Sequence, residues 1–208
     1  MSSIKYFLQF FFIFFLFIVF KILGLKIAST FSSIILRIFG PFFRAKKLIH
    51  QNILKAFPTI NHEDLNKIYT NMWGNYGRIL SEYVFLKNFR NSEFENNIEI
   101  VGQDILNKIK KDEKPVIFIS GHFNNFELMA MHIEKSGVDL AVIYRPLNNK
   151  FLNYIMEKIR KKYICKNQIK KGIAGTRQLL TYFKKKHSIA LMIDQRVSQG
   201  IRCNFFKH

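Results

Sequence analysis

The N-terminal 44 residues are dominated by apolar side chains. Between Phe7 and Phe20 the only polar residue is Gln9, and the apolar stretch from Ile4 to Leu25 is 22 residues long. A helix of about 20 residues spans the hydrocarbon core of a bilayer. The pattern therefore predicts a transmembrane helix at residues 1–26.

A cleavable signal peptide is the alternative explanation for this stretch. Signal peptides carry a basic segment before the apolar run and small residues at a cleavage site after it. Here only Lys5 precedes the run, and Ala28-Ser29-Thr30 is the nearest approach to a cleavage site. The pattern favours an uncleaved anchor.

The basic residues that flank the anchor are unequally distributed. One lysine precedes the apolar run, whereas five basic residues follow it: Lys26, Arg37, Arg44, Lys46 and Lys47. The positive-inside bias places the rest of the chain in the cytoplasm. Residues 27–44 are apolar again, with interspersed serine, threonine and arginine. We expect them to form an amphipathic helix in the membrane interface rather than a second span.

After position 45 the chain alternates between helical patterns and short apolar runs. Helices are expected at Lys46–Ala56, Asn61–Tyr83, Gln103–Lys111, Asn124–Ser136, Asn149–Tyr163 and Gly175–Lys186. Strands are expected at Ile98–Val101, Val116–Ser120, Val138–Tyr144 and Ser188–Asp194. Strands separated by helices of this length indicate an α/β fold with a mostly parallel central sheet flanked by helices. We assign residues 45–208 to this domain.

The chain is strongly basic, with a formal net charge of +19. Residues 145–208 hold 16 Lys and Arg side chains against 2 acidic ones, and such a field attracts anionic partners. The alternative is that the abundance of Lys, Asn, Ile and Phe reflects an AT-rich genome. We expect no nucleic acid as a partner, because the sequence contains no recognised nucleic-acid-binding module.

The two cysteines give no indication of a metal site or a disulfide framework. Cys165 and Cys203 lie far apart and match neither zinc nor CxxC spacing. We therefore expect a body in a reducing compartment, without metal or cofactor.

The segment from Val116 to Glu127 carries the candidate chemistry. A buried strand runs into Gly121 and His122, and active sites of α/β sheets form at the carboxyl ends of strands. If Glu127 lies in the first turns of the following helix, its carboxylate reaches back to the imidazole. It then fixes the tautomer and leaves the other ring nitrogen as a base for an alcohol. The alternative is a helix-capping histidine beside a solvated glutamate.

A family resemblance gives this segment its context. His122-Phe-Asn-Asn-Phe-Glu127 resembles the H-x4-D/E block of glycerolipid and lipid A acyltransferases. It is more closely similar to the G-H-x-G-N-W-E form of the bacterial lipid A biosynthesis acyltransferases, the lauroyl and myristoyl transferases. Four further blocks match in order: Gln51–Pro58, Met72–Arg78 with Glu82, Tyr144–Asn149, and Met192–Gln195 followed by Gly200 and Phe205-Phe206.

The resemblance implies a glycerolipid-acyltransferase-like fold and a reaction. An acyl chain would pass from an acyl carrier protein thioester to a hydroxyl of a phosphorylated glucosamine lipid, at the cytoplasmic side of the bacterial inner membrane. His122 would take the hydroxyl proton and Glu127 would orient His122.

The resemblance also suggests roles for four further residues. Arg145 would bind phosphate or the developing oxyanion. Backbone N–H groups near Asn124 and Asn125 would serve the oxyanion as well. Asp194 would pair with Arg145 or support the site.

The sequence departs from the family pattern in the motif and at the C-terminus. The family glycine is Asn124 here, and the family tryptophan is Phe126. Asn tolerates a positive φ better than most residues, so we expect the turn to be kept. The chain stops at His208, where the family continues through further strands, and we therefore expect a C-terminally incomplete domain. A related glycolipid or phospholipid acyltransferase and an inactive truncated membrane protein are the alternatives.

Overall fold

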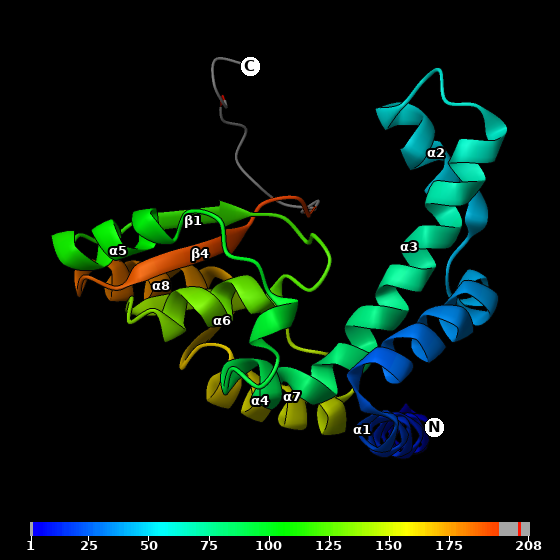
Figure 1. The fold of residues 1–208 in the computed structure, drawn as a ribbon, viewed down its shortest axis with the longest axis horizontal. Coiled ribbons are helices and arrows are strands. Elements are labelled where there is room, and N and C mark those ends of the chain that lie inside the picture. Colours follow the sequence, from blue (N-terminus) through cyan, green and yellow to red (C-terminus); the bar gives the residue numbers. More distant parts are fainter. Residues whose placement is uncertain (1, 196–203, 205–208) are drawn as a thin grey trace.

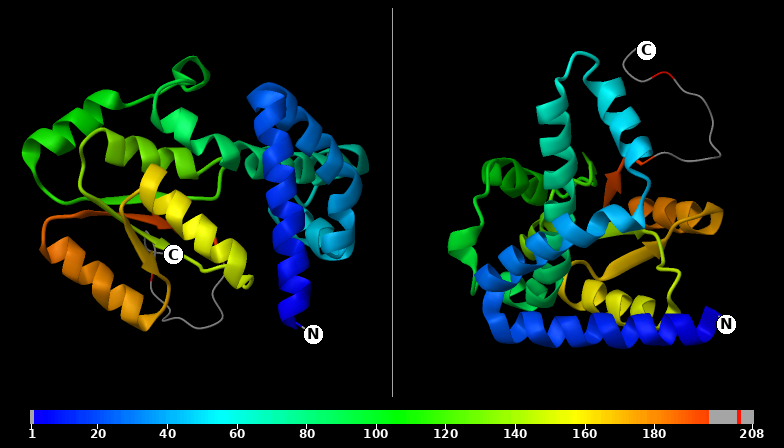
Figure 2. Two further views of the ribbon diagram at one scale, coloured as in Figure 1. Left: turned by 90° about the horizontal axis from the view of Figure 1, so that it is seen from below. Right: turned by 90° about the vertical axis from the view of Figure 1, so that its right-hand side faces the viewer.

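The N-terminal helix is long and sharply bent. The computed structural model describes residues 2–195 and Asn204. Helix α1 (Ser2–Phe39) is interrupted at Gly24, whose φ of 75° and ψ of 164° lie in a region that residues with a Cβ rarely enter. The segments before and after Gly24 therefore run in different directions (Figure 2, right). Within the described residues, the stretch Ser3–Phe43 is long and apolar enough to cross a membrane.

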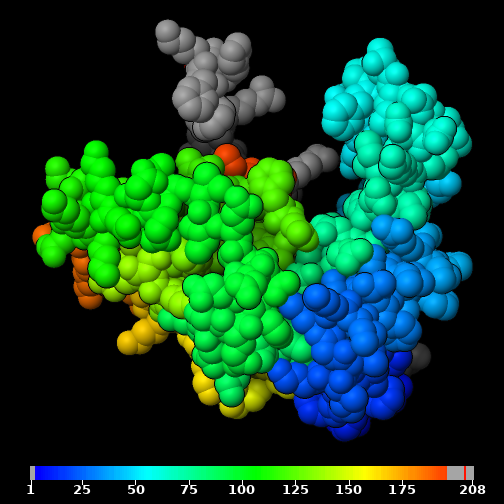
Figure 3. Space-filling model, in the orientation of Figure 1, coloured from blue at the N-terminus to red at the C-terminus, as the bar shows by residue number. Residues whose placement is uncertain are grey.

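The second half of α1 packs closely against α3. After a 3-10 turn (Gly40–Phe43), α2 (Lys46–Ala56) leads to α3 (His62–Glu82), whose first turn is capped by the Asn61 side chain. A Cβ placed on Gly77 would lie 2.2 Å from the Ser32 carbonyl oxygen, so a glycine is needed for this contact. Helix α2 and the adjoining end of α3 project away from the α/β body (Figure 3).

The α/β body is built on a parallel sheet of four strands. The strands are β1 (Ile117–Ser120), β2 (Leu140–Tyr144), β3 (Asn167–Lys170) and β4 (Ser188–Met192), in the spatial order β1-β4-β2-β3. Figure 1 shows β1 beside β4. The connecting helices are α5 (Gln103–Asp112), α6 (Glu127–Lys135), α7 (Lys150–Tyr163) and α8 (Ile173–Lys184). The expected α/β fold with a parallel sheet is confirmed.

Alternating strand residues contact different helices. Leu140 and Val142 of β2 join a large apolar cluster with α6, α7 and the short helix α4 (Leu86–Arg90), whereas Ala141 joins a smaller cluster with α8. Phe20 and Ala28 of α1 are buried in the large cluster. The N-terminal helix is thus packed against the body that carries the sheet.

Two sequence expectations about strands need correction. Ile98–Val101 was expected to be a strand, but it pairs with no strand of the described sheet, and Val101 is 90% exposed. Strand β3 was not expected, because its sequence Asn-Gln-Ile-Lys is mostly polar. It lies at the sheet edge, where Ile169 alone of its four residues is buried. The motif positions Gly200 and Phe205-Phe206 and the chain end lie outside the described residues.

Candidate active site

Strand register brings His122 and Asp194 together. Strands β1 and β4 are parallel neighbours, with Ser120 opposite Met192. His122 and Asp194 each follow two residues later, so they leave the same edge of the sheet side by side. This is the carboxyl end of the strands, where α/β proteins form their sites.

The Asp194 carboxylate holds His122 at two points. Its Oδ1 lies 2.7 Å from the ring Nδ1, and its Oδ2 accepts a 2.7 Å hydrogen bond from the His122 backbone N–H. The backbone bond and then the ring contact lower the pKa of Asp194 below its ordinary value. A Cβ on Gly121 would come within 3.1 Å of Oδ2, so the absence of a side chain there lets the carboxylate approach.

This pairing determines the state of the other ring nitrogen. A carboxylate at Nδ1 favours the tautomer with its proton on Nδ1, which leaves a lone pair on Nε2. The Gln195 amide nitrogen lies 3.3 Å from His122 Nε2 and can donate to it. The edge of the Phe126 ring packs against the imidazole, with centroids 4.7 Å apart.

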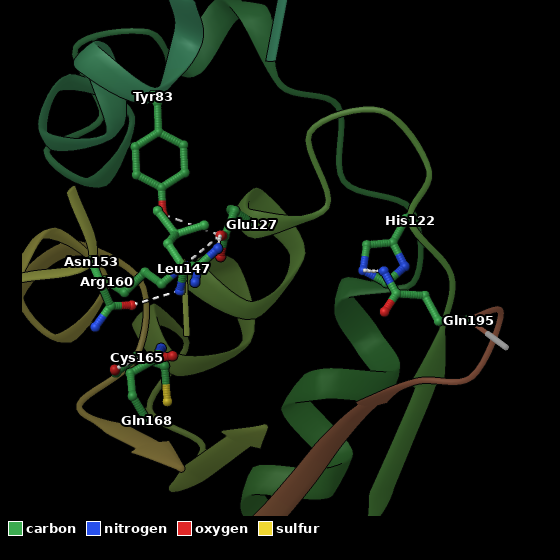
Figure 4. A network of polar contacts seen from close by, with 9 residues as sticks. All are labelled: Tyr83, His122, Glu127, Leu147, Asn153, Arg160, Cys165, Gln168 and Gln195. Carbon is green, nitrogen blue, oxygen red and sulfur yellow. Dashed lines mark hydrogen bonds and ion pairs between the residues drawn. The ribbon is translucent and has the colours of Figure 1, made fainter. Parts of the chain in front are cut away.

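Glu127 belongs to a separate, buried network. It is the first residue of α6 and is 7% exposed. Its Oε1 accepts hydrogen bonds from Arg160 Nε at 2.8 Å and from the Tyr83 hydroxyl at 3.2 Å, and it forms an ion pair with Arg160 Nη2 at 2.7 Å. Figure 4 shows Glu127 turned toward Tyr83 and Arg160, with His122 standing apart near Gln195.

The buried network keeps Tyr83 and Arg160 each in one protonation state. Burial raises the pKa of Tyr83, and the Glu127 carboxylate raises it further, so the hydroxyl stays a donor. Burial opposes the charge of Arg160, but Glu127 and Tyr83 outweigh it and raise the pKa of the guanidinium. A buried carboxylate and guanidinium joined by a hydrogen bond and an ion pair satisfy each other's charge.

The expected contact between Glu127 and His122 is not formed. Instead, His122 contacts Asp194 and Glu127 contacts Arg160. Within the described residues, no hydrogen bond joins the side chains of Glu127 and His122; Asp194 takes the position at the imidazole and Arg160 takes the carboxylate. The physical reason is that Glu127 points into the core behind the loop, where a buried cation requires a counter-charge. The sequence gives Asp194 two alternative roles, pairing with Arg145 or supporting the site. In the structure its carboxylate contacts His122.

A large pocket opens beside His122. Its volume is about 1100 Å³, and its lining combines apolar residues of β2 and β4 with polar and cationic side chains. His122, Glu127, Arg145, Arg160 and Gln195 all line it. Arg145 is exposed just after the end of β2. The pocket therefore joins a polar rim to an apolar wall.

The loop between His122 and Glu127 takes the expected turn. Asn124 has a φ of 44°, so asparagine adopts the conformation for which the family pattern has glycine. The Asn124 and Asn125 backbone N–H groups donate to no acceptor within residues 2–195. Their expected role as oxyanion donors stays a prediction.

Sequence reasoning missed Tyr83 and Arg160. Arg160 stands among several lysines of α7, and nothing in that local pattern distinguishes it from a solvated basic residue. Tyr83 follows the block that ends at Glu82, but its spacing to Glu127 across 44 positions carries no local signal. Both are recognised only once α7 and the end of α3 are placed against α6.

The family comparison bears on what this site does. The model of the bacterial lipid A biosynthesis acyltransferase family matches residues 1–208. The chain belongs to this family. The sequence of this lipid A biosynthesis acyltransferase has no significant match among the curated proteins. As an acyltransferase of this family it uses an acyl donor and a lipid acceptor, and its long apolar N-terminal helix suggests association with a membrane.

Proposed function

We propose that this acyltransferase moves a fatty acyl chain from an acyl carrier protein thioester to a hydroxyl of a phosphorylated glucosamine lipid, a lipid A precursor. The observation that carries the proposal is the His122–Asp194 pair beside a pocket of about 1100 Å³. A carboxylate-held imidazole suits deprotonation of an alcohol. Family membership supplies the reaction class.

His122 acts as the general base. Asp194 holds the proton on Nδ1, so Nε2 has the lone pair that accepts the hydroxyl proton. The acceptor hydroxyl takes the place of the Gln195 amide at Nε2. Asp194 then stabilises the imidazolium that forms.

The oxygen of the acceptor bonds to the thioester carbonyl carbon as its proton leaves for Nε2. The carbonyl electron pair moves onto oxygen, where Arg145 of the same pocket stabilises the charge. When the tetrahedral intermediate collapses, the carbon–sulfur bond breaks and the thiolate takes the proton back from His122. The products are an ester and a free thiol.

Glu127 supports the reaction through Arg160. Its carboxylate holds the guanidinium with a hydrogen bond and an ion pair, and both residues line the large pocket. Arg160 thus presents a fixed positive charge on the wall opposite the loop. In this proposal Glu127 is a positioning residue, and Asp194 takes the role at the imidazole that sequence reasoning gave to Glu127.

Three features support the donor and the location. Acyl carrier protein is acidic, and residues 145–208 carry 16 basic against 2 acidic side chains. The basic residues that follow the apolar run favour a body on the cytoplasmic side of the inner membrane. The lauroyl and myristoyl transferases to which the motif is similar suggest a saturated chain of this length class.

The direct test is acyl transfer by the full chain purified in detergent. Acyl carrier protein charged with lauroyl or myristoyl chains is mixed with the phosphorylated glucosamine lipid, and mass spectrometry measures the mass added to the lipid. The expected result is one added acyl chain. Transfer to a diacylglycerol-type acceptor alone would favour a phospholipid acyltransferase, and no transfer to either lipid would defeat the proposal.

A further inference from the structure

A second, smaller pocket lies on the other side of the His122 loop. Its volume is about 570 Å³, and it lies between the second half of α1, helix α3 and the loop. Phe123, Asn124 and Asn125 line it, whereas His122 and Phe126 line the large pocket. The loop therefore separates two pockets, and the reaction has two substrates.

Among the described residues, two cations of the smaller pocket form an ion pair with no acidic side chain. Arg78 of α3 makes one long hydrogen bond, 3.4 Å to Ser29 Oγ, although a guanidinium has five N–H donors. Glu82 stands one helical turn further on, yet no ion pair between it and Arg78 is formed. Lys26 is exposed at the rim and forms no ion pair within the described residues. These side chains leave positive charge directed at the pocket.

The acceptors of the pocket are also incompletely satisfied. Asn125 is 8% exposed, and its amide nitrogen donates to Glu82 Oε2 at 3.0 Å. Its Oδ1 is buried and has no hydrogen-bond donor within the described residues. A buried acceptor without a donor costs about 1–3 kcal/mol, so a ligand with a hydroxyl or amide N–H would remove this penalty.

The pocket is placed for a ligand that comes from a bilayer. Lys26 follows the bend at Gly24 by two residues, at the end of the apolar stretch that suggests a membrane anchor. A lipid with its chains beside the first segment of α1 would bring its headgroup to this level. The lining supplies cations for an anion and acceptors for a hydroxyl, and both groups occur on a phosphorylated sugar.

We propose that the smaller pocket is the headgroup subsite of the lipid acceptor, in which Arg78 and Lys26 bind a phosphate and Asn125 accepts a hydrogen bond from a hydroxyl or amide of the same headgroup. This inference rests on the proposed function. A headgroup held there lies against the loop that carries His122. The large pocket is then left for the acyl donor and for the one acceptor hydroxyl that reaches His122 Nε2.

Binding without turnover tests the subsite. The full-length His122→Ala chain, which cannot take the hydroxyl proton, is titrated in mixed micelles with the phosphorylated glucosamine lipid. A second titration uses the same lipid after enzymatic removal of its phosphates. Adding Arg78→Gln should weaken binding of the phosphorylated lipid by about 10- to 100-fold and leave binding of the dephosphorylated lipid within about 3-fold.

Two matched variants control for charge and folding. Lys67→Gln removes a positive charge from the exposed surface of the same helix, outside both pockets, and should leave binding unchanged. Arg78→Lys keeps the charge but not the fork of donors, and should bind between the parent and Arg78→Gln. Circular dichroism melting establishes that each variant is folded.

Kinetics on the active enzyme distinguish this inference from the proposed function. Arg78→Gln should raise the KM for the lipid about 10-fold or more and leave the KM for acyl carrier protein unchanged. An equal loss of affinity for both forms of the lipid, or an unchanged KM for the lipid, would overturn the subsite while transfer by the parent enzyme still stands. Absence of transfer by the parent would instead defeat the proposed function.

Discussion

The two ends of the segment from His122 to Glu127 differ in how they hold a charge. At one end, a partly exposed imidazole is paired with Asp194, whose side chain is 43% exposed. At the other, Glu127 is enclosed with Arg160 and Tyr83, and the side chains of the ion pair are 9% and 16% exposed. The partly exposed His122–Asp194 pair and the buried Glu127–Arg160 pair are thus only five positions apart along the chain.

The difference teaches what each carboxylate is able to do. An exposed carboxylate contributes little to folding but leaves its partner free to exchange protons with a substrate. A buried carboxylate in an ion pair stabilises a cation that otherwise has no counter-charge, and its removal is felt by the fold. The comparison assigns chemistry to His122 with Asp194, and support to Glu127 with Arg160.

Loss of the imidazole should have the largest effect on catalysis. In the His122→Ala variant we expect kcat to fall by about 10³- to 10⁴-fold. Among the described side chains, no other one is held by Asp194 and could take the hydroxyl proton in its place. The thermal unfolding temperature should hardly change, since the side chain is 32% exposed. Activity within 10-fold of the parent would break the assignment.

Loss of the buried carboxylate should affect the fold more than the chemistry. The Glu127→Gln variant leaves Arg160 without a counter-charge, and we expect the free energy of unfolding to fall by about 3 kcal/mol. Glu134→Gln is the matched control, because Glu134 lies on the same helix and pairs with Arg90 at a more exposed site. That variant should lose less than about 1 kcal/mol. Equal losses in denaturant titrations would contradict the contrast between the two sites.

Neutralising the exposed carboxylate should reverse this pattern. In Asp194→Asn we expect kcat to fall by about 10²-fold, because the amide no longer favours the tautomer with a bare Nε2 or stabilises the imidazolium. The unfolding temperature should change by less than it does in Glu127→Gln. A stability loss as large as that of Glu127→Gln, with kcat retained, would exchange the two roles.

Acid should give the smallest effect. The pKa of Asp194 is lowered in the folded chain, so its contribution to stability is complete above the ordinary aspartate value of 3.8 and is lost as the pH falls through the lower folded value. We expect the difference in unfolding temperature between the parent and Asp194→Asn to be about 1–3 °C at pH 6 and to shrink as the pH falls below 3.8. A difference that grows on acidification would contradict the sign.

Local patterns in the sequence predicted most helices and the site loop. Helix α2 has the predicted bounds, and α3 begins one residue after the capping Asn61. His122 was placed at a strand end because Val116–Ser120 is apolar and is followed by glycine. In these cases the signal lies within a few residues of chain, so propensity and periodicity suffice.

The missed features depend on contacts between distant segments. Asp194 meets His122 because β4 is inserted next to β1, and no spacing along the chain reveals that order. The five-residue interval to Glu127 suggested a pair, but α6 directs that carboxylate into the core toward Arg160. Strand β3 could not be predicted, because a strand with a single buried residue shows no alternation of apolar and polar positions.

If the first segment of α1 lies in a bilayer as we propose, the bend at Gly24 sets the height at which the enzyme works. The second half of α1 is locked to α3 by the contact of Ser32 with Gly77, and Phe20 and Ala28 are buried against the body, so the two arms of α1 and the domain form a rigid bracket. For a chain anchored as we propose, the imidazole then stands at one level above the lipid tails. Hydroxyl groups at that level are reachable, and deeper ones are not. Bilayer depth itself thus becomes a selectivity filter.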